Sequence, residues 1–271
     1  MSRGRLRVAL VIALITVLAY YAKSTTNPVT GETQHVGDIT PEQEVALGLQ
    51  AAPDMAAQYG GVANDPAGTR KVNDVCARII SRSKAQGASS EYRFECHLLA
   101  DPNTVNAFAL PGGQVFITEG LLTRLTTEGQ LAGVLGHEIG HVVARHGAQQ
   151  MAKAQLTQGL TGAAVLAAYD PNNPSSQRNA AVIAMIGQLV TMKFGRNDEL
   201  QADKLGVQFE SEAGYDPRAM IGVMKILDAE AGGNNPPEFF STHPNPENRI
   251  PRIQQEIDAL YPNGVPSGLE P

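Results

Sequence analysis

The stretch VLGHEIGHVVARHG, at residues 134–147, places ionisable side chains in the middle of an apolar run. Burying such groups without a partner costs free energy, so the pattern requires a compensating interaction. Thr127 and Gln130 form a capping box ahead of the run, and Gly147 is a residue type that ends helices. We therefore expect a single helix over 128–146 that carries these side chains.

On that helix His137 and His141 lie one turn apart, about 40° from each other around the axis. Two imidazoles in this arrangement can hold one metal ion, and Glu138 beside them can reach a metal-bound water molecule. This is the H-E-x-x-H zinc-binding arrangement. The alternative is a pair of core histidines whose hydrogen bonds are satisfied within the protein.

A zinc site of this kind needs a third protein ligand and a position open to water. The longer pattern H-E-x-x-H-x-x-G-x-x-H does not supply it, because Ala144 and Gly147 stand at its glycine and histidine positions. His146 lies about 140° around the helix from His141. We therefore expect His146 to point elsewhere, as a structural residue or as a cation at the helix C-terminus.

A glutamate from a later helix is the other source of a third ligand. In RNDELQADKLG, at 196–206, Glu199 and Asp203 lie one turn apart on one face. Glu199 could bind the metal while Asp203 accepts a hydrogen bond from a ligand histidine. A solvated acidic face is the alternative, and spacing alone does not favour Glu199 over Glu210 or Glu230.

The remaining periodicity indicates an α+β protein that is mainly helical. The expected helices begin at Pro41 and cover 66–84 and 252–260, and the expected strands cover 93–99, 107–110 and 114–118. The net charge is −6, with no basic patch beyond the N-terminus, so we expect no nucleic-acid partner.

The N-terminus has the composition of a secretory signal or a signal anchor. Several arginines precede an uncharged run at 8–22, which is slightly shorter than the ~20 residues of a typical membrane-spanning helix. Arginines in this position predict export of the residues that follow. An uncleaved anchor, a cleaved signal and a buried helix are the alternatives. We expect residues 1–30 to form this segment and its linker, and residues 31–271 to form one domain.

Export changes the interpretation of the two cysteines. In an oxidising compartment Cys76 and Cys96 can form a disulfide. Two buried free thiols are the alternative, and the sequence does not distinguish the two.

Two apolar helical stretches, at 154–170 and 179–190, flank the linker PNNPSSQ. Each is too short to span a membrane without including polar residues. We expect a helical hairpin that covers the site as a lid. The alternative is a hairpin that dips into a membrane surface.

Four stretches make the chain similar to a known family. They are NAFALPGGQVFITEGLL (106–122), LAGVLGHEIGHVVARHG (131–147), the E-x-x-x-D of NDELQADKLG (197–206), and STHPNPENRI (241–250). With this ordered set the chain resembles the bacterial cell-envelope branch of the HtpX/BepA-like zinc metallopeptidases, a family that also includes the CAAX prenyl proteases.

The resemblance implies a zincin-type (gluzincin) metalloprotease domain with a small β-sheet packed on the active-site helix. It implies one Zn²⁺ per chain and a set of site residues contributed by three of the four stretches. These are the metal ligands His137, His141 and Glu199, the catalytic base Glu138, Asp203 as a hydrogen-bond partner of a ligand, and His243 and Arg249 reaching the active site.

The resemblance also implies how a substrate binds. An extended polypeptide is expected to pair with an edge strand formed by Gln114, Val115, Phe116, Ile117 and Thr118. Main-chain pairing tolerates many sequences, so unfolded or extended segments are the expected substrates.

His243 has two possible roles: it donates a hydrogen bond to the oxyanion, or it occupies the fourth zinc position and holds the enzyme inactive.

The implied function is a zinc-dependent endopeptidase that hydrolyses peptide bonds in unfolded or misassembled proteins, in envelope protein quality control. It would act on the periplasmic side of the inner membrane if the anchor is retained, or in the periplasm if the signal is cleaved. The alternative is a non-catalytic chaperone or assembly factor whose zinc is capped by His243. A structural zinc site is disfavoured, because Cys76 and Cys96 lie outside the motif.

Overall fold

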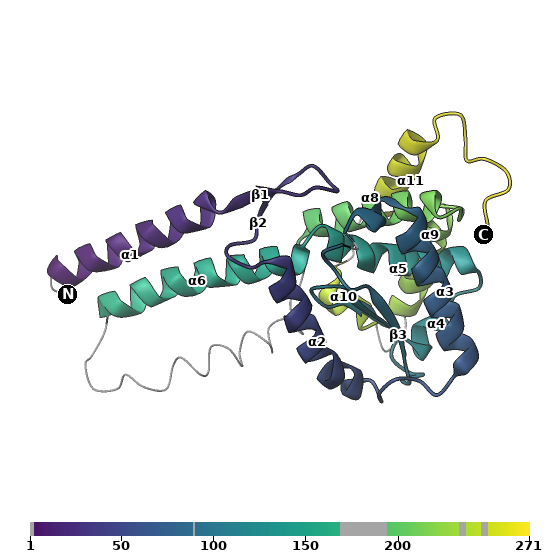
Figure 1. The fold of residues 1–271 in the computed structure, drawn as a ribbon, viewed down its shortest axis with the longest axis horizontal. Coiled ribbons are helices and arrows are strands. Elements are labelled where there is room, and N and C mark those ends of the chain that lie inside the picture. Colours follow the sequence, from purple (N-terminus) through teal and green to yellow (C-terminus); the bar gives the residue numbers. More distant parts are fainter. Residues whose placement is uncertain (1–2, 89, 169–193, 233–236, 245–248) are drawn as a thin grey trace. The chain divides into compact units, whose positions relative to one another are not determined.

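The computed structural model describes residues 3–88, 90–168, 194–232, 237–244 and 249–271 (Figure 1). The chain divides into two compact units, which we describe separately. One consists of Met1–Thr40 and Gly147–Met192, and the other of Pro41–His146 and Lys193–Pro271. The division into residues 1–30 and 31–271 stays a prediction.

The first unit contains two long helices and a short hairpin. Its elements are α1 (Arg3–Ala22), β1 (Ser24–Thr26), β2 (Thr33–His35) and most of α6 (His146–Ala168). The helices α1 and α6 approach closely, because a Cβ at Gly159 would lie only 2.5 Å from a methyl carbon of Thr16. The predicted apolar stretch 154–170 falls on α6 as far as Ala168, whereas 179–190 lies outside the described residues.

The large apolar side chains of α1 are mostly exposed. They are Val8, Leu10, Val11, Leu14, Ile15, Leu18 and Tyr21, each more than half exposed. This exposure argues against a buried core helix. Across the described residues, no helix combines the length and apolarity needed to cross a bilayer.

The second unit packs several helices and a three-stranded sheet around one buried helix. Its elements are α2 (Pro41–Gln58), α3 (Pro66–Arg82), the 3₁₀ turn η1 (Lys84–Ala88), β3 (Glu95–Leu99), β4 (Ala107–Ala109), β5 (Gln114–Thr118), α4 (Glu119–Leu122), α5 (Glu128–Val143), α8 (Arg196–Glu212), α9 (Ala219–Ala231), α10 (Phe239–Thr242) and α11 (Arg249–Leu260). These positions agree closely with the predicted elements, and the predicted mainly helical α+β class is confirmed.

The helix α5 lies at the centre of the second unit and is buried along nearly all of its length (Figure 1). It packs most extensively against α8. Glycines permit the close approach, since a Cβ at Gly140 would lie 3.1 Å from the carbonyl oxygen of Ala202. A Cβ at Gly206 would lie 3.1 Å from the backbone nitrogen of His137. The H-E-x-x-H face of α5 is thereby held against the acidic face of α8.

The three-stranded sheet has the order β3-β5-β4, with β3 parallel and β4 antiparallel to β5. The predicted edge strand Gln114–Thr118 is therefore the central strand, and all five of its residues are buried. This prediction was wrong. The main-chain groups of β5 already pair on both sides, so they cannot pair with a substrate.

The helix α5 ends at Val143, and the predicted helix over 128–146 is too long at its C-terminus. Arg145 has a left-handed backbone φ of 55°, which costs about 1–3 kcal/mol for a residue other than glycine. Its guanidinium holds this turn, because Nε and Nη2 each lie 2.8 Å from Oε2 of the buried Glu44. Gly147, expected to end the helix, lies instead in the first turn of α6.

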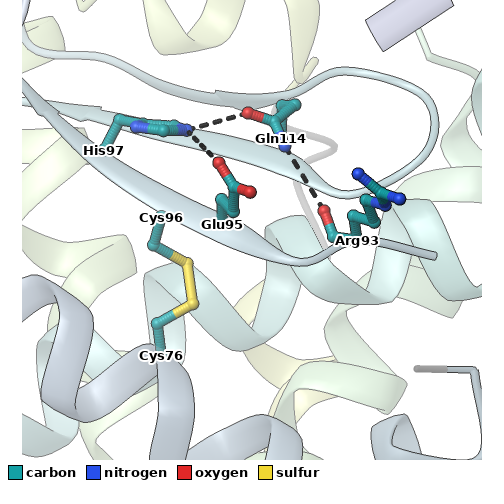
Figure 2. Close-up of a disulfide and its surroundings, with 6 residues drawn as sticks. All are labelled: Cys76, Arg93, Glu95, Cys96, His97 and Gln114. Carbon is teal, nitrogen blue, oxygen red and sulfur yellow. Dashed lines mark hydrogen bonds and ion pairs between the residues drawn. A yellow bond between two sulfur atoms is a disulfide. The ribbon is translucent and has the colours of Figure 1, made fainter. Parts of the chain in front are cut away.

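The sulfur atoms of Cys76, on α3, and Cys96, on β3, lie at disulfide distance (Figure 2). The pair links a helix to the sheet. Beside it, His97 of β3 hydrogen-bonds through Nε2 to Oε1 of Gln114 on β5, at 2.9 Å. The close-up thus shows α3 joined to β3 by two sulfur atoms at disulfide distance, and β3 joined to β5 by one side-chain hydrogen bond.

We expect protein prepared from an oxidising compartment to show no free thiol when denatured without reductant, and two after reduction. Reduction should lower the free energy of unfolding by about 3 kcal/mol, because a loop of this length loses its covalent constraint. Thiol titration and urea unfolding measure both effects. A Cys76→Ser, Cys96→Ser double variant is the control, and its stability should not respond to reductant. Two free thiols in the unreduced parent would contradict the disulfide.

Candidate metal centre

Four buried side chains point one ligand atom each toward a common position. His137, His141, Glu199 and His243 offer atoms that all lie within 4.8 Å of one another. The Nε2 atoms of His137 and His141 are 3.1 Å apart. His243 Nδ1 lies 3.3 Å from His137 Nε2 and 3.1 Å from Glu199 Oε1. His141 Nε2 lies 3.4 Å from the same carboxylate oxygen.

These separations fit a metal ion. Ligand atoms about 2.0–2.1 Å from a tetrahedral zinc lie about 3.3 Å from one another, which is the spacing found here. Protonation supports the same conclusion. His137 Nδ1 lies 2.9 Å from Asp203 Oδ1, and a carboxylate only accepts hydrogen bonds. The proton of His137 is therefore on Nδ1, and the lone pair on Nε2 faces the cluster, where a cation would stabilise it.

The pKa directions of His141 and Glu199 are those of groups ready to bind a cation. Burial lowers the pKa of His141 well below its usual value, so this ring is neutral. Burial by itself would raise the pKa of Glu199, but His243 and His141 lower it well below its usual value. Neutral imidazole and ionised carboxylate are the forms that bind metals.

Three segments that are far apart in the sequence build the cluster. The helix α5 supplies both motif histidines, α8 supplies Glu199, and His243 follows directly after α10. The structure therefore brings together the three predicted ligands, and it places His243 at ligand distance, which is consistent with one of its two expected roles.

Arg249, at the start of α11, lies behind the ligands. Its Nε and Nη2 donate to the two carboxylate oxygens of Asp203 at 2.7 and 2.8 Å, and its Nη1 lies 3.1 Å from Glu199 Oε2. Burial would raise the pKa of Asp203, yet the charge of Arg249 and the hydrogen bond from His137 lower it. Arg249 thus holds two carboxylates in place and offsets one of their two negative charges.

Glu138 lies beside the cluster and is 0% exposed. Neither of its carboxylate oxygens has a hydrogen-bond partner within the described residues. The nearest printed contact is His243 Nε2, 3.6 Å from Oε1. Burial by itself lowers the pKa of His243, but the carboxylates of Glu138 and Glu199 raise it above its usual value. His243 therefore lies between the candidate base and the ligand atoms.

Two aromatic rings stack on the histidines of the site. Phe239 stacks on His243 with ring centroids 4.4 Å apart, and Phe194 stacks on His141 with centroids 4.0 Å apart. Neither phenylalanine was predicted. Phe239 precedes His243 by one helical turn, which is a weak signal, whereas Phe194 reaches the site only through the tertiary fold.

We predicted that His146 points away from the site, but it contacts the ligand His141. Its Nδ1 lies 2.9 Å from His141 Nδ1, and its Nε2 lies 2.7 Å from Gln201 Oε1. The prediction was wrong because it assumed a continuous helix. The left-handed turn at Arg145 ends α5 and turns His146 back toward His141.

The two other candidate glutamates lie apart from the cluster. Glu230 forms an ion pair with Arg124 at 2.9 Å. Glu210 is fully buried, and a Cβ at Gly133 would lie 3.6 Å from its Oε1. Burial, and then the charge of Asp216, raise the pKa of Glu210 well above its usual value. Glu199 is the glutamate that meets the motif histidines.

Comparison with known proteins agrees with this arrangement. The model of peptidase family M48 matches residues 66–257. The beta-barrel assembly-enhancing protease of Escherichia coli (strain K12) is 32% identical over 210 residues, which is 75% of this chain and 42% of that protein. The homologous protease of Yersinia pestis is 30% identical over 235 residues, covering 84% of this chain and 47% of the relative.

A mitochondrial relative shows the same similarity. The mitochondrial metalloendopeptidase OMA1 of Schizosaccharomyces pombe is 35% identical over 188 residues, 66% of this chain and 51% of that protein. The chain spans about half the length of these curated relatives. Metallopeptidases of family M48 depend on a metal, and the cluster of histidines and glutamate lies within the matched region. Because the match covers most of its length, the chain belongs to peptidase family M48.

Proposed function

We propose that this protein is a zinc-dependent endopeptidase that cleaves unfolded or misassembled polypeptides in the cell envelope. The observation that carries the proposal is Glu138, a buried carboxylate beside four convergent ligand atoms, whose two oxygens accept no hydrogen bond from the described residues. Such a group is costly in a purely structural site, whereas a metallopeptidase uses it as a base. A non-catalytic chaperone would leave Glu138 unexplained.

Zinc is the metal that the donor set favours. Three imidazoles and one carboxylate suit zinc better than magnesium or calcium, which prefer oxygen ligands. When bound, zinc would polarise the scissile carbonyl and lower the pKa of a water molecule. Glu138 would accept the proton from that water and pass it to the leaving amine.

His243 acts as a cap on this site in our proposal. Its Nδ1 lies at ligand distance while its Nε2 faces Glu138. A peptide carbonyl needs the position next to the metal and the base, so His243 has to move before substrate binds. After this movement the same ring could donate a hydrogen bond to the oxyanion.

Arg249 and Asp203 act by positioning in our proposal. Asp203 accepts the Nδ1 proton of His137, and Arg249 holds Asp203 and Glu199 in their orientations. A carboxylate behind a ligand histidine fixes the tautomer and raises the basicity of the ring.

An extended substrate would pair with β4 in our proposal. This strand (Ala107–Ala109) is an edge of the sheet and the strand that packs most against α5. Backbone pairing at an edge strand recognises extended chains of many sequences.

Export with retention at the membrane is the last part of the proposal, supported by the exposed apolar side chains of α1.

We expect the Glu138→Gln variant to bind one zinc per chain and to cleave casein at least about 100-fold more slowly than the parent, because the base is lost. Metal analysis and peptide release from the full-length chain measure this. Glu212→Gln, on the exposed side of α8, is the control and should cleave normally. Equal cleavage by parent and Glu138→Gln would refute the assignment of the base.

We expect the His243→Ala variant to cleave casein several-fold faster than the parent at saturating zinc, because the capping ligand is removed. The half-buried His97→Ala variant controls for the loss of a histidine elsewhere. A slower rate with zinc retained would contradict capping and support the oxyanion role. An unchanged rate would rule out both roles.

We expect Arg249→Leu to lower the free energy of unfolding of the metal-free protein by about 3–5 kcal/mol, because Asp203 and Glu199 would remain buried without their cation. Urea unfolding measures the change. Arg252→Leu, exposed on the same helix, should change stability by about 0.5 kcal/mol or less. Equal effects of the two substitutions would contradict the positioning role.

We expect the full-length protein to float with liposomes, and a Leu14→Glu, Leu18→Glu variant to bind them much more weakly, because charges in the apolar region are costly. Leu49→Glu changes an exposed leucine of α2 and serves as the control. Equal flotation of all three proteins would show that α1 is not the membrane-binding element.

A further inference from the structure

We propose that His146 and Gln201 are positioning residues that fix the tautomer of His141, so that its Nε2 lone pair faces the metal position. This inference rests on the proposed function, because it takes His141 as a zinc ligand. It concerns residues that the H-E-x-x-H motif does not include.

The hydrogen bonds determine where the protons lie, starting from Gln201. Its amide oxygen Oε1 lies 2.7 Å from His146 Nε2, and an amide oxygen only accepts hydrogen bonds. The Nε2 atom of His146 therefore carries a proton. In the neutral ring Nδ1 is then an acceptor, and it lies 2.9 Å from His141 Nδ1.

The same logic continues to the ligand. His141 must donate its Nδ1 proton to His146, which leaves its Nε2 deprotonated. That Nε2 lies 3.1 Å from His137 Nε2 and 3.4 Å from Glu199 Oε1, at the centre of the cluster. The other tautomer would direct an N–H group at the position where the metal binds.

The two motif histidines are therefore supported in different ways. His137 donates to the carboxylate of Asp203, whose charge is balanced by Arg249. His141 donates to a neutral imidazole, which in turn donates to a neutral amide. A second carboxylate behind His141 would add negative charge to a buried site that already contains Glu138, Glu199 and Asp203.

The fold supplies the support for this pair. The left-handed turn at Arg145, anchored on Glu44, ends α5 and directs His146 back to His141. His146 is 1% exposed, so its hydrogen bonds are protected from competition with water. Gln201 lies on α8 two residues after Glu199, which means that α8 supplies both a ligand and the acceptor for His146 in the relay formed by Gln201, His146 and His141.

The test compares variants of the full-length chain by zinc affinity, measured in competition with a chelator. His146→Leu removes the acceptor, and we expect zinc to bind about 10–100-fold more weakly. His146→Asn retains an oxygen near the position of Nδ1 and should bind zinc within a few-fold of the parent. Gln208→Leu, at a half-buried position of α8, is the matched control and should bind like the parent.

A second readout does not depend on activity or on metal. Nitrogen-15 spectra of the histidines in the zinc-free parent should show the His141 proton on Nδ1, and Gln201→Leu should convert part of this population to the other tautomer. Gln201→Leu also tests the relay if His146→Leu does not fold. A parent His141 protonated on Nε2, or equal zinc affinity in the parent and His146→Leu, would overturn the proposal.

These results separate the relay from the proposed function. A parent that binds zinc with the expected tautomer but does not cleave casein would contradict the endopeptidase and leave the relay standing. A parent that cleaves casein while His146→Leu binds zinc unchanged would contradict the relay alone.

Discussion

The close packing of α5 against α8 is the constraint on which the rest of the second unit depends. Glycines on both helices bring the two motif histidines against Glu199 and Asp203 in a region that excludes water. In such a region unpaired lone pairs and charges are costly. The fold compensates for Asp203 with Arg249, and the remaining convergent lone pairs require a cation. The metal is therefore expected to contribute to folding as well as to chemistry.

The site is arranged in a closed form. His243 has one ring nitrogen at ligand distance and the other facing Glu138, and Phe239 stacks on its ring. In our proposal this arrangement makes His243 a reversible cap on the site.

Much of this could be predicted from the sequence, because local signals were strong. Capping residues and the apolar periodicity located α2, α3 and the start of α5, and one-turn spacing placed His137 with His141. The errors arose where tertiary contacts override local pattern. The Glu44–Arg145 ion pair ends α5 early and redirects His146. The strands β3 and β4 pair with both sides of β5, which was expected to be an edge strand. Spacing likewise could not choose Glu199 over Glu210, since that choice depends on which face of α8 meets α5.

The central claim is that three histidines and one glutamate hold a single zinc ion. X-ray absorption at the zinc edge of the purified full-length protein tests this most directly. The account predicts four nitrogen or oxygen neighbours at about 2.0–2.1 Å, with the outer-shell scattering of three imidazoles. Removing His243 should reduce the imidazole scattering to two rings. Sulfur in the first shell, or a zinc surrounded by water with no imidazole, would contradict the account.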